Sequence, residues 1–339
     1  MATRLKDIAA DLGVSVVTVS KVLRNHSDIS EETRERVMKR IRELNYQPNL
    51  AARALVTGRS SSIGLIVPDL VHPFFAEVAK GITHLLREQG YVLMISSSEE
   101  DAAVERHEIA HMLARRVDAL LLASVQSDAA EFRILDQHKT PLILVDRRVP
   151  GLTAGFVGVD DEDAGRVATG HLIAQGCQRI AHIRGPEVST AIGRLAGDQK
   201  ALSEHAIRPN KRFIITGRTA DDAADRSGYE AMQHLLALSP RPDGVFCFND
   251  PVALGAMQAV LDAGLRVPED VAVVGCGNIH YASFLRIPLT SIDQNSAVLG
   301  ENAARLALSL VGLKKTAPPQ TILLESRLVV RASSRRTKE

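Results

Sequence analysis

The sequence is poor in aromatic residues and in cysteine. It has no tryptophan, aromatic residues make up 4% of its 339 positions, and its three cysteines are scattered at Cys177, Cys247 and Cys276. This odd, widely spaced set fits neither a disulfide framework nor a zinc knuckle, and it is typical of a reducing compartment. We find no run of about 18 apolar residues that could span a membrane. Residues 1–7 also lack the apolar segment of a secretion signal. We therefore expect a cytoplasmic protein that does not bind a membrane.

The signature motifs of several enzyme classes are also missing. There is no Walker A phosphate loop and no Gly-x-Ser-x-Gly nucleophile elbow. Gly275 and Gly277 lack the third glycine and the following helix of a dinucleotide site. We expect no enzyme activity, no cofactor and no bound metal.

One motif argues for a metal. His107–His111 has the two-histidine spacing of a zinc protease helix with a glutamate between, and Glu131 follows as a possible third ligand. The alternative is a solvent-facing helix, because residues 105–108 form a polar run and Met112 and Leu113 supply a buried face. We favour the alternative, since a strand predicted over 119–123 separates His111 from Glu131, unlike the helix pair of a metalloprotease.

Charge is unevenly distributed. Residues 1–60 contain 11 basic and 7 acidic residues, whereas the remainder contains 30 basic and 33 acidic residues. A basic head on a mildly acidic body indicates a polyanionic partner for the head. A solvated basic helix face would give the same count, so charge alone does not decide.

The first 60 residues have the pattern of short helices. Apolar residues from Leu5 to Leu12 recur at helical spacing, Gly13 ends this helix, and Ser15 is a natural N-cap for a second one. A third helix begins near Ser30, and Pro48 ends the unit. Two short helices joined through a glycine indicate a helix-turn-helix, whose second helix enters the DNA major groove.

The start of that second helix carries the candidate base contacts. Val16 and Val17 cannot both face the core if Val19, Val22 and Leu23 do, and exposed branched side chains suit thymine methyl groups. Thr18, Ser20 and Lys21 can bond phosphate oxygens or base edges.

Beyond the Gly- and Ser-containing segment 58–62, apolar runs alternate with helical stretches. The runs are residues 63–67, 92–95, 119–123, 142–145, 180–183, 213–216, 245–248 and 271–274. Such runs indicate buried parallel strands, and eight of them suggest two doubly wound lobes. Polar residues where the runs end are pocket candidates, because ligands of open α/β sheets bind there; each could equally be an ordinary turn residue.

These residues resemble the lactose/galactose repressor (LacI/GalR) family over essentially the whole chain. The motifs are residues 5–9, 13–15, 18–23, 45–49, 62–68, 72–75, 116–120, 144–147, 248–250 and 328–331. The resemblance implies an all-α helix-turn-helix domain followed by a periplasmic-binding-protein-like (type I) α/β body of two doubly wound lobes. It also implies a repressor controlled by a small-molecule effector, for which we expect a carbohydrate. The alternative is a solute-binding protein without a regulatory role.

The resemblance also sets domain boundaries. We expect the DNA-binding domain over 1–48, a hinge helix and linker over 49–61, the effector-binding and dimerisation domain over 62–332, and a polar tail over 333–339. The first lobe should take 62–159 and 290–320, and the second lobe 160–289 and 321–332.

Within the hinge, Ala52–Leu55 matches the segment that becomes a helix in the minor groove, and Leu55 matches the leucine wedged between central base pairs. Leu55 could otherwise be a linker residue packed on the body. Together, the candidate DNA contacts are Thr3, Lys6, Ser15, Val16, Val17, Thr18, Ser20, Lys21, Asn25, Asn49, Ala52, Arg53 and Leu55.

The implied effector cleft lies between the lobes. Arg194 matches the arginine that grips the ligand, although a surface arginine would fit the pattern too; of Phe74 and Phe75, we expect one in the cleft and one in the core. The candidate effector contacts are Phe74, Ser97, Ser124, Asp146, Arg147, Arg194, Asn249, Asp250 and Asn278.

Two departures from the family pattern leave the effector open. Gly277 stands where relatives carry an acidic residue, so that Asn278 would have to replace it, and the segment near Ala223 lacks a stacking aromatic residue. For partners we expect near-palindromic operator DNA, a small-molecule effector and a second copy of the chain, with the early helices of the first lobe in the dimer contact.

Overall fold

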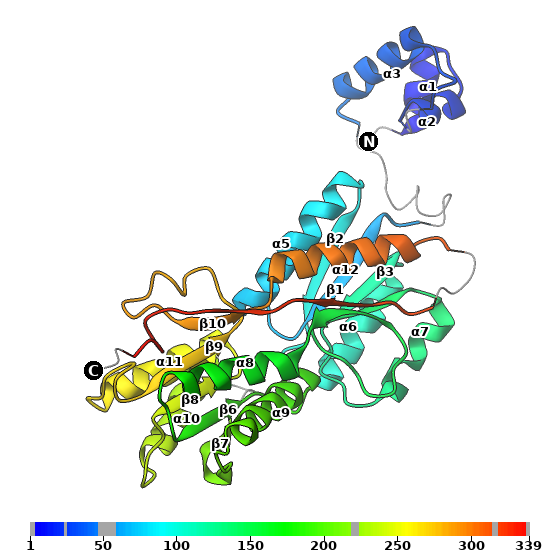
Figure 1. The fold of residues 1–339 in the computed structure, drawn as a ribbon. Helices are drawn as coiled ribbons and strands as arrows, with labels where there is room; N and C mark the ends of the chain where they lie inside the picture. Colours follow the sequence, from blue (N-terminus) through cyan, green and yellow to red (C-terminus); the bar gives the residue numbers. More distant parts are fainter. Residues whose placement is uncertain (1–3, 24–25, 47–58, 218–223, 314–317, 337–339) are drawn as a thin grey trace. The chain divides into compact units, whose positions relative to one another are not determined.

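The computed structural model describes residues 4–23, 26–46, 59–217, 224–313 and 318–336, and it divides into two compact units, residues 1–60 and 61–339 (Figure 1). The first unit contains α1 (Leu5–Leu12), α2 (Val16–Leu23) and α3 (Glu31–Glu43). Its small core consists of Ile8, Ala9, Val19, Val22, Val37 and Ile41. The three helices that the sequence predicts are therefore confirmed.

Local signals set the ends of these helices. Gly13 ends α1 with a φ of 66°, a left-handed conformation that glycine adopts without strain. Ser15 caps α2, since its Oγ accepts the Thr18 N–H at 3.0 Å. Ser30 caps α3 through the Thr33 N–H. These caps fix the turn between α1 and α2, and so the direction in which α2 presents its first residues.

The second unit consists of two sheets, each covered by helices on both faces (Figure 1). The first sheet has the order β11-β5-β4-β3-β1-β2, and all its strands are parallel. Its strands are β1 (Ser62–Val67), β2 (Val92–Ser97), β3 (Ala119–Leu122), β4 (Leu142–Val145), β5 (Gly155–Val159) and β11 (Thr321–Leu324). One face is covered by α5 (Pro73–Glu88) and α12 (Ser296–Leu310). The other is covered by α6 (Ala102–Ala114), η1 (Ala129–Phe132) and α7 (Arg133–His138). We call this assembly the first lobe.

The second lobe repeats this plan. Its sheet has the order β12-β10-β9-β8-β6-β7, with β12 antiparallel to β10 and the other pairs parallel. The strands are β6 (Ile180–Arg184), β7 (Ile214–Thr216), β8 (Gly244–Cys247), β9 (Ala272–Cys276), β10 (Thr290–Asp293) and β12 (Arg327–Val329). One face is covered by α8 (Asp161–Ala174) and α9 (Ser189–Glu204), and the other by α10 (Ala224–Leu236) and α11 (Asp250–Asp262); η2 (Lys211–Phe213) precedes β7. None of the described helices is both long and apolar enough to cross a membrane.

The chain passes between the lobes after β5, after β10 and between β11 and β12. Two strands lie in the lobe opposite to the expected one. Residues 290–293 pair with β9 and β12 in the second lobe, and residues 321–324 pair with β5 in the first lobe. The chain adds β10 to the sheet of the second lobe before it crosses to the first lobe, and it adds β11 to the sheet of the first lobe before it crosses back.

The expected polar tail from residue 333 onward is also wrong for its described part. Ser333 and Ser334 are fully buried. Ser333 Oγ donates to the Val273 carbonyl at 2.7 Å, and Arg336 Nε donates to the Pro268 carbonyl at 3.0 Å. Residues 333–336 are therefore part of the second lobe, because backbone carbonyls satisfy their polar groups.

Three helix pairs pack at very short distances through glycines that face each other's backbone. The pairs are Gly81 and Gly300 in α5 and α12, Gly165 and Gly197 in α8 and α9, and Gly228 and Gly255 in α10 and α11. A Cβ at any of these six positions would lie 1.6–2.1 Å from a carbonyl oxygen of the partner helix. No larger residue fits there without separating the helices.

Candidate DNA-contacting helix and interlobe cavity

The start of α2 exposes two branched apolar side chains. Val16 is 44% exposed and Val17 is 64% exposed, whereas Val19 is fully buried in the helical core. The sequence assigned the two faces of α2 in the same way. Within the described part of its unit, this valine pair on the first turn of α2 is exposed, and such a pair suits an apolar surface such as thymine methyl groups.

The other candidates in the described part of the head have defined positions. Lys6 is exposed on α1. The Ser15 and Thr18 hydroxyls share a hydrogen bond of 2.8 Å, Ser20 is half-buried, and Lys21 forms an ion pair with Asp28. To contact a DNA phosphate, Lys21 would have to give up its ion pair with Asp28. Other candidates lie outside the described residues: Thr3, Asn25, Asn49, Ala52, Arg53 and Leu55.

A cavity of about 520 Å³ lies between the two lobes. Its walls come from the segments that follow the carboxyl ends of strands in both sheets, including His72 after β1, Asp146 after β4 and Asn249 after β8. Parallel strands bring these segments to one edge of each sheet, and the two edges face each other across the cavity. Its volume is within the range of small-molecule sites.

Two arginines in the cavity wall are held by carboxylates. Arg147 forms two hydrogen bonds with Glu100, of 2.7 and 3.0 Å. Arg194 Nε donates to Asp161 at 2.9 Å and its Nη1 donates to the Phe248 carbonyl at 2.6 Å. Both guanidinium groups are almost completely buried, so their planes are fixed before any ligand arrives.

Asp146 is a buried carboxylate between these arginines. Gln294 Nε2, from the second crossover, donates to its Oδ1 at 3.2 Å. Burial raises the pKa of Asp146, against the opposing effects of Arg194 and Arg147. Burial likewise raises the pKa of Asp161 to about 6, although Arg194 opposes the shift. Asp146 therefore gives the cavity wall a poorly solvated carboxylate, while Asp161 lies behind the wall and holds Arg194.

Both phenylalanines after the first strand line the cavity. Phe74 and Phe75 are only 4% and 5% exposed, and their rings meet edge to face with centroids 5.1 Å apart. The expectation that only one of them reaches the cleft is therefore wrong. Each ring also packs in the core of the first lobe, since the start of α5 lies at the boundary between core and cavity.

Four candidates lie outside the cavity wall: Ser97, Ser124, Asp250 and Asn278. Ser97 Oγ donates to the Pro68 carbonyl at 3.4 Å. Ser124 is buried and donates to Glu105 at 2.7 Å. These hydroxyls are used inside the first lobe, which corrects their expected role as effector contacts.

Asp250 and Asn278 serve the interior of the second lobe instead. Asp250 accepts the Ser291 hydroxyl at 2.6 Å and the Ile279 N–H at 2.8 Å. Burial raises the pKa of Asp250 to about 6. Asn278 Oδ1 accepts a hydrogen bond from Arg331 at 2.7 Å. Asn278 therefore does not replace the missing acidic residue at Gly277 as a cavity group.

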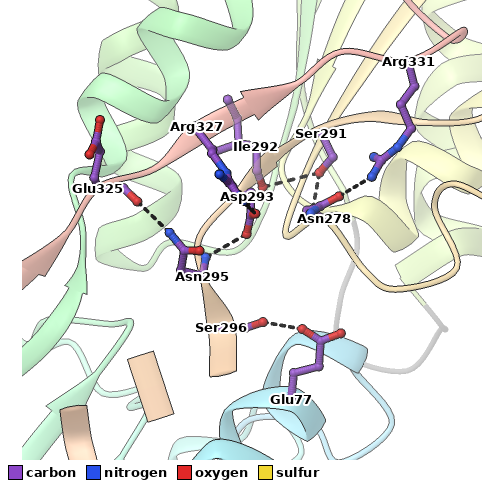
Figure 2. Close-up of polar contacts among 10 residues, drawn as sticks. All are labelled: Glu77, Asn278, Ser291, Ile292, Asp293, Asn295, Ser296, Glu325, Arg327 and Arg331. Carbon is purple, nitrogen blue, oxygen red and sulfur yellow. Dashed lines mark hydrogen bonds and ion pairs between the residues drawn. The ribbon is translucent and has the colours of Figure 1, made fainter. Parts of the chain in front are cut away.

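Polar contacts tie the crossovers to both lobes (Figure 2). Asp293, at the end of β10, pairs with Arg327 of β12 at 3.4 Å, and Asn295 Nδ2 donates to the Glu325 carbonyl at 3.1 Å. At the start of α12, Ser296 donates to Glu77 of α5. These bonds hold two of the three crossing segments side by side.

Several cavity residues were missed from the sequence. They include His72, Glu100, Arg184, Phe248, Gln294 and Tyr281. Phe248 was counted as the last residue of the predicted run 245–248, whereas β8 ends at Cys247, so Phe248 lies just beyond the strand. Gln294 gave no such signal, because the strand before it was not predicted.

The zinc-protease motif lies on the surface of α6. His107, Glu108 and His111 could bring their ligand atoms within 4.8 Å of one another, on an exposed face of the helix. Glu131, the expected third ligand, instead pairs with Arg106 at 3.5 Å. The exposed position of these side chains matches the solvent-facing alternative.

Comparison with known proteins assigns the two units. Residues 4–49 match the model for bacterial regulatory proteins of the lacI family, and residues 169–334 match a periplasmic binding protein-like domain. The chain is 33% identical to the HTH-type transcriptional repressor PurR of Mannheimia succiniciproducens, over 98% of each chain. This chain belongs to the LacI family. A PurR repressor of Escherichia coli is 34% identical over 98% of this chain and 97% of its own.

Solved structures agree with this assignment. The lac repressor dimer bound to operator and the anti-inducer ONPF superimposes with a TM-score of 0.87, at 29% identity over 98% of this chain and 99% of the other. A complex of the transcriptional regulator CelR with cellobiose gives a TM-score of 0.73, at 31% identity over 98% and 99%. This LacI-family member is therefore a DNA-binding transcriptional regulator with an effector-binding body. Its relatives are repressors, which sets aside both the enzyme classes and a solute-binding protein without regulatory role.

Proposed function

We propose that this LacI-family regulator represses transcription as a homodimer on a near-palindromic operator, and that a neutral carbohydrate in the interlobe cavity changes its affinity for that operator. The observation that carries the proposal is that the exposed Val16 and Val17 on α2 occur in the same chain as an interlobe cavity of about 520 Å³ in the body. Acting on operators, the protein would work in the cytoplasm, at the nucleoid.

In this proposal the head divides its contacts between bases and phosphates. Val16 and Val17 face thymine methyl groups, while Lys6 and Lys21 neutralise phosphates. The further contacts are Thr3, Ser15, Thr18, Ser20, Asn25, Asn49, Ala52 and Arg53. Two heads related by a two-fold axis read two half-sites, so the operator repeats the symmetry of the dimer.

Residues 49–61 would couple the two units. A helix this short is unstable alone and folds when DNA and a second copy stabilise it. Leu55 is the apolar wedge of that helix, so Leu55→Ala should largely abolish operator binding and leave effector binding intact. An anisotropy titration with unchanged operator affinity would refute this role.

The charges in the cavity favour a neutral ligand. Each of its three arginines has a carboxylate partner: Arg147 with Glu100, Arg184 with Glu187 and Arg194 with Asp161. Asp146 adds a further acidic group to the wall. An anionic ligand would therefore find no uncompensated cation among the described lining residues.

The remaining lining suits a polyhydroxylated ring. Phe74, Phe75 and Phe248 present aromatic faces that pack against sugar C–H groups, and Asp146, Arg147, Arg194 and Asn249 can bond its hydroxyls. The solved complex of CelR with cellobiose is one relative with a carbohydrate ligand, at 31% identity.

A thermal-shift screen with neutral sugars, sugar acids and inorganic phosphate tests this function. We expect a neutral mono- or disaccharide to raise the melting temperature and to change operator affinity, because it binds the folded state. Arg194→Met should abolish both effects, whereas Lys200→Met on the exposed face of the same helix should preserve them. Stabilisation by acids or phosphate but by no neutral sugar would contradict the proposal.

A further inference from the structure

His72 lies between two hydrogen-bond donors. It is the N-cap of α5 in the first lobe, where its Nδ1 faces the Phe74 N–H at 3.3 Å. Its Nε2 lies 3.0 Å from Asn249 Nδ2 in the second lobe. Both side chains belong to the cavity wall, so their contact crosses the cleft from one lobe to the other.

These contacts cannot both be hydrogen bonds. A neutral imidazole has one acceptor nitrogen, and its other nitrogen carries a proton. Asn249 cannot turn its oxygen towards His72 without loss, because Oδ1 accepts the Val252 N–H at 2.9 Å and caps α11. The side-chain amide group of Asn249 therefore presents its N–H to the ring.

The contact within α5 decides which nitrogen of His72 accepts. Phe74 N–H belongs to the same short segment as His72, so it stays in place when the lobes move. With Nδ1 as the acceptor from Phe74, Nε2 carries the proton and faces a second donor, the side-chain amide of Asn249. Burial lowers the pKa of His72 to about 4, and the positive charge of Arg147 adds to this effect against Glu100, so the ring is neutral at pH 7.

We propose that His72 and Asn249 form a two-donor subsite, with one donor from each lobe, for a hydroxyl or carbonyl oxygen of the effector. An oxygen bound by both donors would replace an unfavourable N–H to N–H approach with two hydrogen bonds, and it would link the lobes. The subsite rests on the proposed function, because it names how that cavity recognises its ligand.

Other groups in the cavity wall await hydrogen-bond partners as well. Ser227 Oγ, Arg147 Nε and Arg184 Nε are buried atoms without a hydrogen-bond partner among the described residues, and all three residues line the cavity. Buried polar groups left in this way are unfavourable, so a ligand that carries its own donors and acceptors is favoured over an apolar one.

Asn249→Asp tests the donor pair without any ligand. Aspartate caps a helix as well as asparagine does, but it offers His72 an acceptor in place of the amide N–H. We expect the melting temperature of the ligand-free full-length protein to rise by about 2–4 °C. The gain should vanish in a His72→Leu background. Asn210→Asp, the same change at the cap of η2, is the matched control and should show no dependence on residue 72.

A proton-detected nitrogen spectrum of the histidine rings identifies the protonated nitrogen directly, with the His72→Leu variant assigning the signal. We expect the proton on Nε2. A proton on Nδ1, or an Asn249→Asp effect that is destabilising or equal with and without His72, would overturn the donor pair.

The ligand arm uses glucose, galactose, ribose and cellobiose as probes. For a sugar that stabilises the wild-type protein, we expect the apparent affinity of Asn249→Asp to be at least tenfold lower than that of wild type. The apparent affinity of Asn210→Asp should equal that of wild type. Equal affinity for all three proteins would overturn the subsite. The ring and stability measurements need neither sugar nor DNA, so a failure of operator binding would refute the proposed function and leave them standing.

Discussion

Adding a single methyl group to α8 should push it away from α9, the helix that carries Arg194 of the cavity wall. Gly165 of α8 packs against the backbone of Arg194 in α9. A Cβ at residue 165 would lie 2.1 Å from the Arg194 carbonyl oxygen. Atoms of this kind do not approach closer than 3.0 Å, so the helices must part by about 1 Å. Such overpacking costs about 1–3 kcal/mol, set against a gain of up to about 1 kcal/mol in helix propensity.

Gly170 provides the control within the same helix. A Cβ at this position meets nothing within 4 Å, so Gly170→Ala receives the propensity gain alone. We expect denaturant unfolding to place Gly165→Ala about 1–3 kcal/mol below Gly170→Ala. Because the displaced backbone carries Arg194, Gly165→Ala should also weaken effector binding, which a thermal-shift titration measures. Equal stability of the two variants, with equal effector affinity, would refute the argument from close packing.

The remaining predictions concern pH and DNA. Burial lowers the pKa of His182 to about 3, and Arg184 adds to this shift, so the unfolded chain takes up a proton between pH 6.5 and 3 that the folded chain refuses. The free energy of unfolding therefore decreases as the pH falls through this window. His182→Leu should remove about 2 kcal/mol of the decrease between pH 7 and pH 5. If the variant's unfolding free energy depended on pH as the wild type's does, this prediction would be wrong. Val17→Ala should change which operator is preferred, whereas Lys21→Ala should weaken all sequences and reduce the salt slope by about 1; a uniform loss in both variants would disprove this division of roles.

The buried parallel strands were predictable because their sequences are continuous apolar runs. In β1, for example, all six residues are buried between helices on both faces. The strands near the crossovers gave no such run: β5 contains two glycines, and β11 and β12 are edge strands with alternating or partial exposure. β10 (Thr-Ser-Ile-Asp) also lacks a continuous apolar run, and residues 290–293 and 321–324 were both assigned to the wrong lobes.

The candidate site was predictable where a polar residue directly follows a predicted strand. Asp146 and Asn249 meet this condition and line the cavity. Asp250 follows the same strand as Asn249, yet it turns inward to Ser291. Which of two adjacent polar residues faces a cavity depends on tertiary hydrogen bonds with residues far along the chain. His72 was missed because its partner across the cleft is 177 positions away.

Selection of binding sites from a pool of random duplexes by the purified full-length protein tests the central claim most directly. The account predicts enrichment of one near-palindrome whose binding weakens steeply with salt and changes when a stabilising sugar is added. Recovery of no preferred sequence, at any salt concentration and with each sugar present or absent, would contradict it.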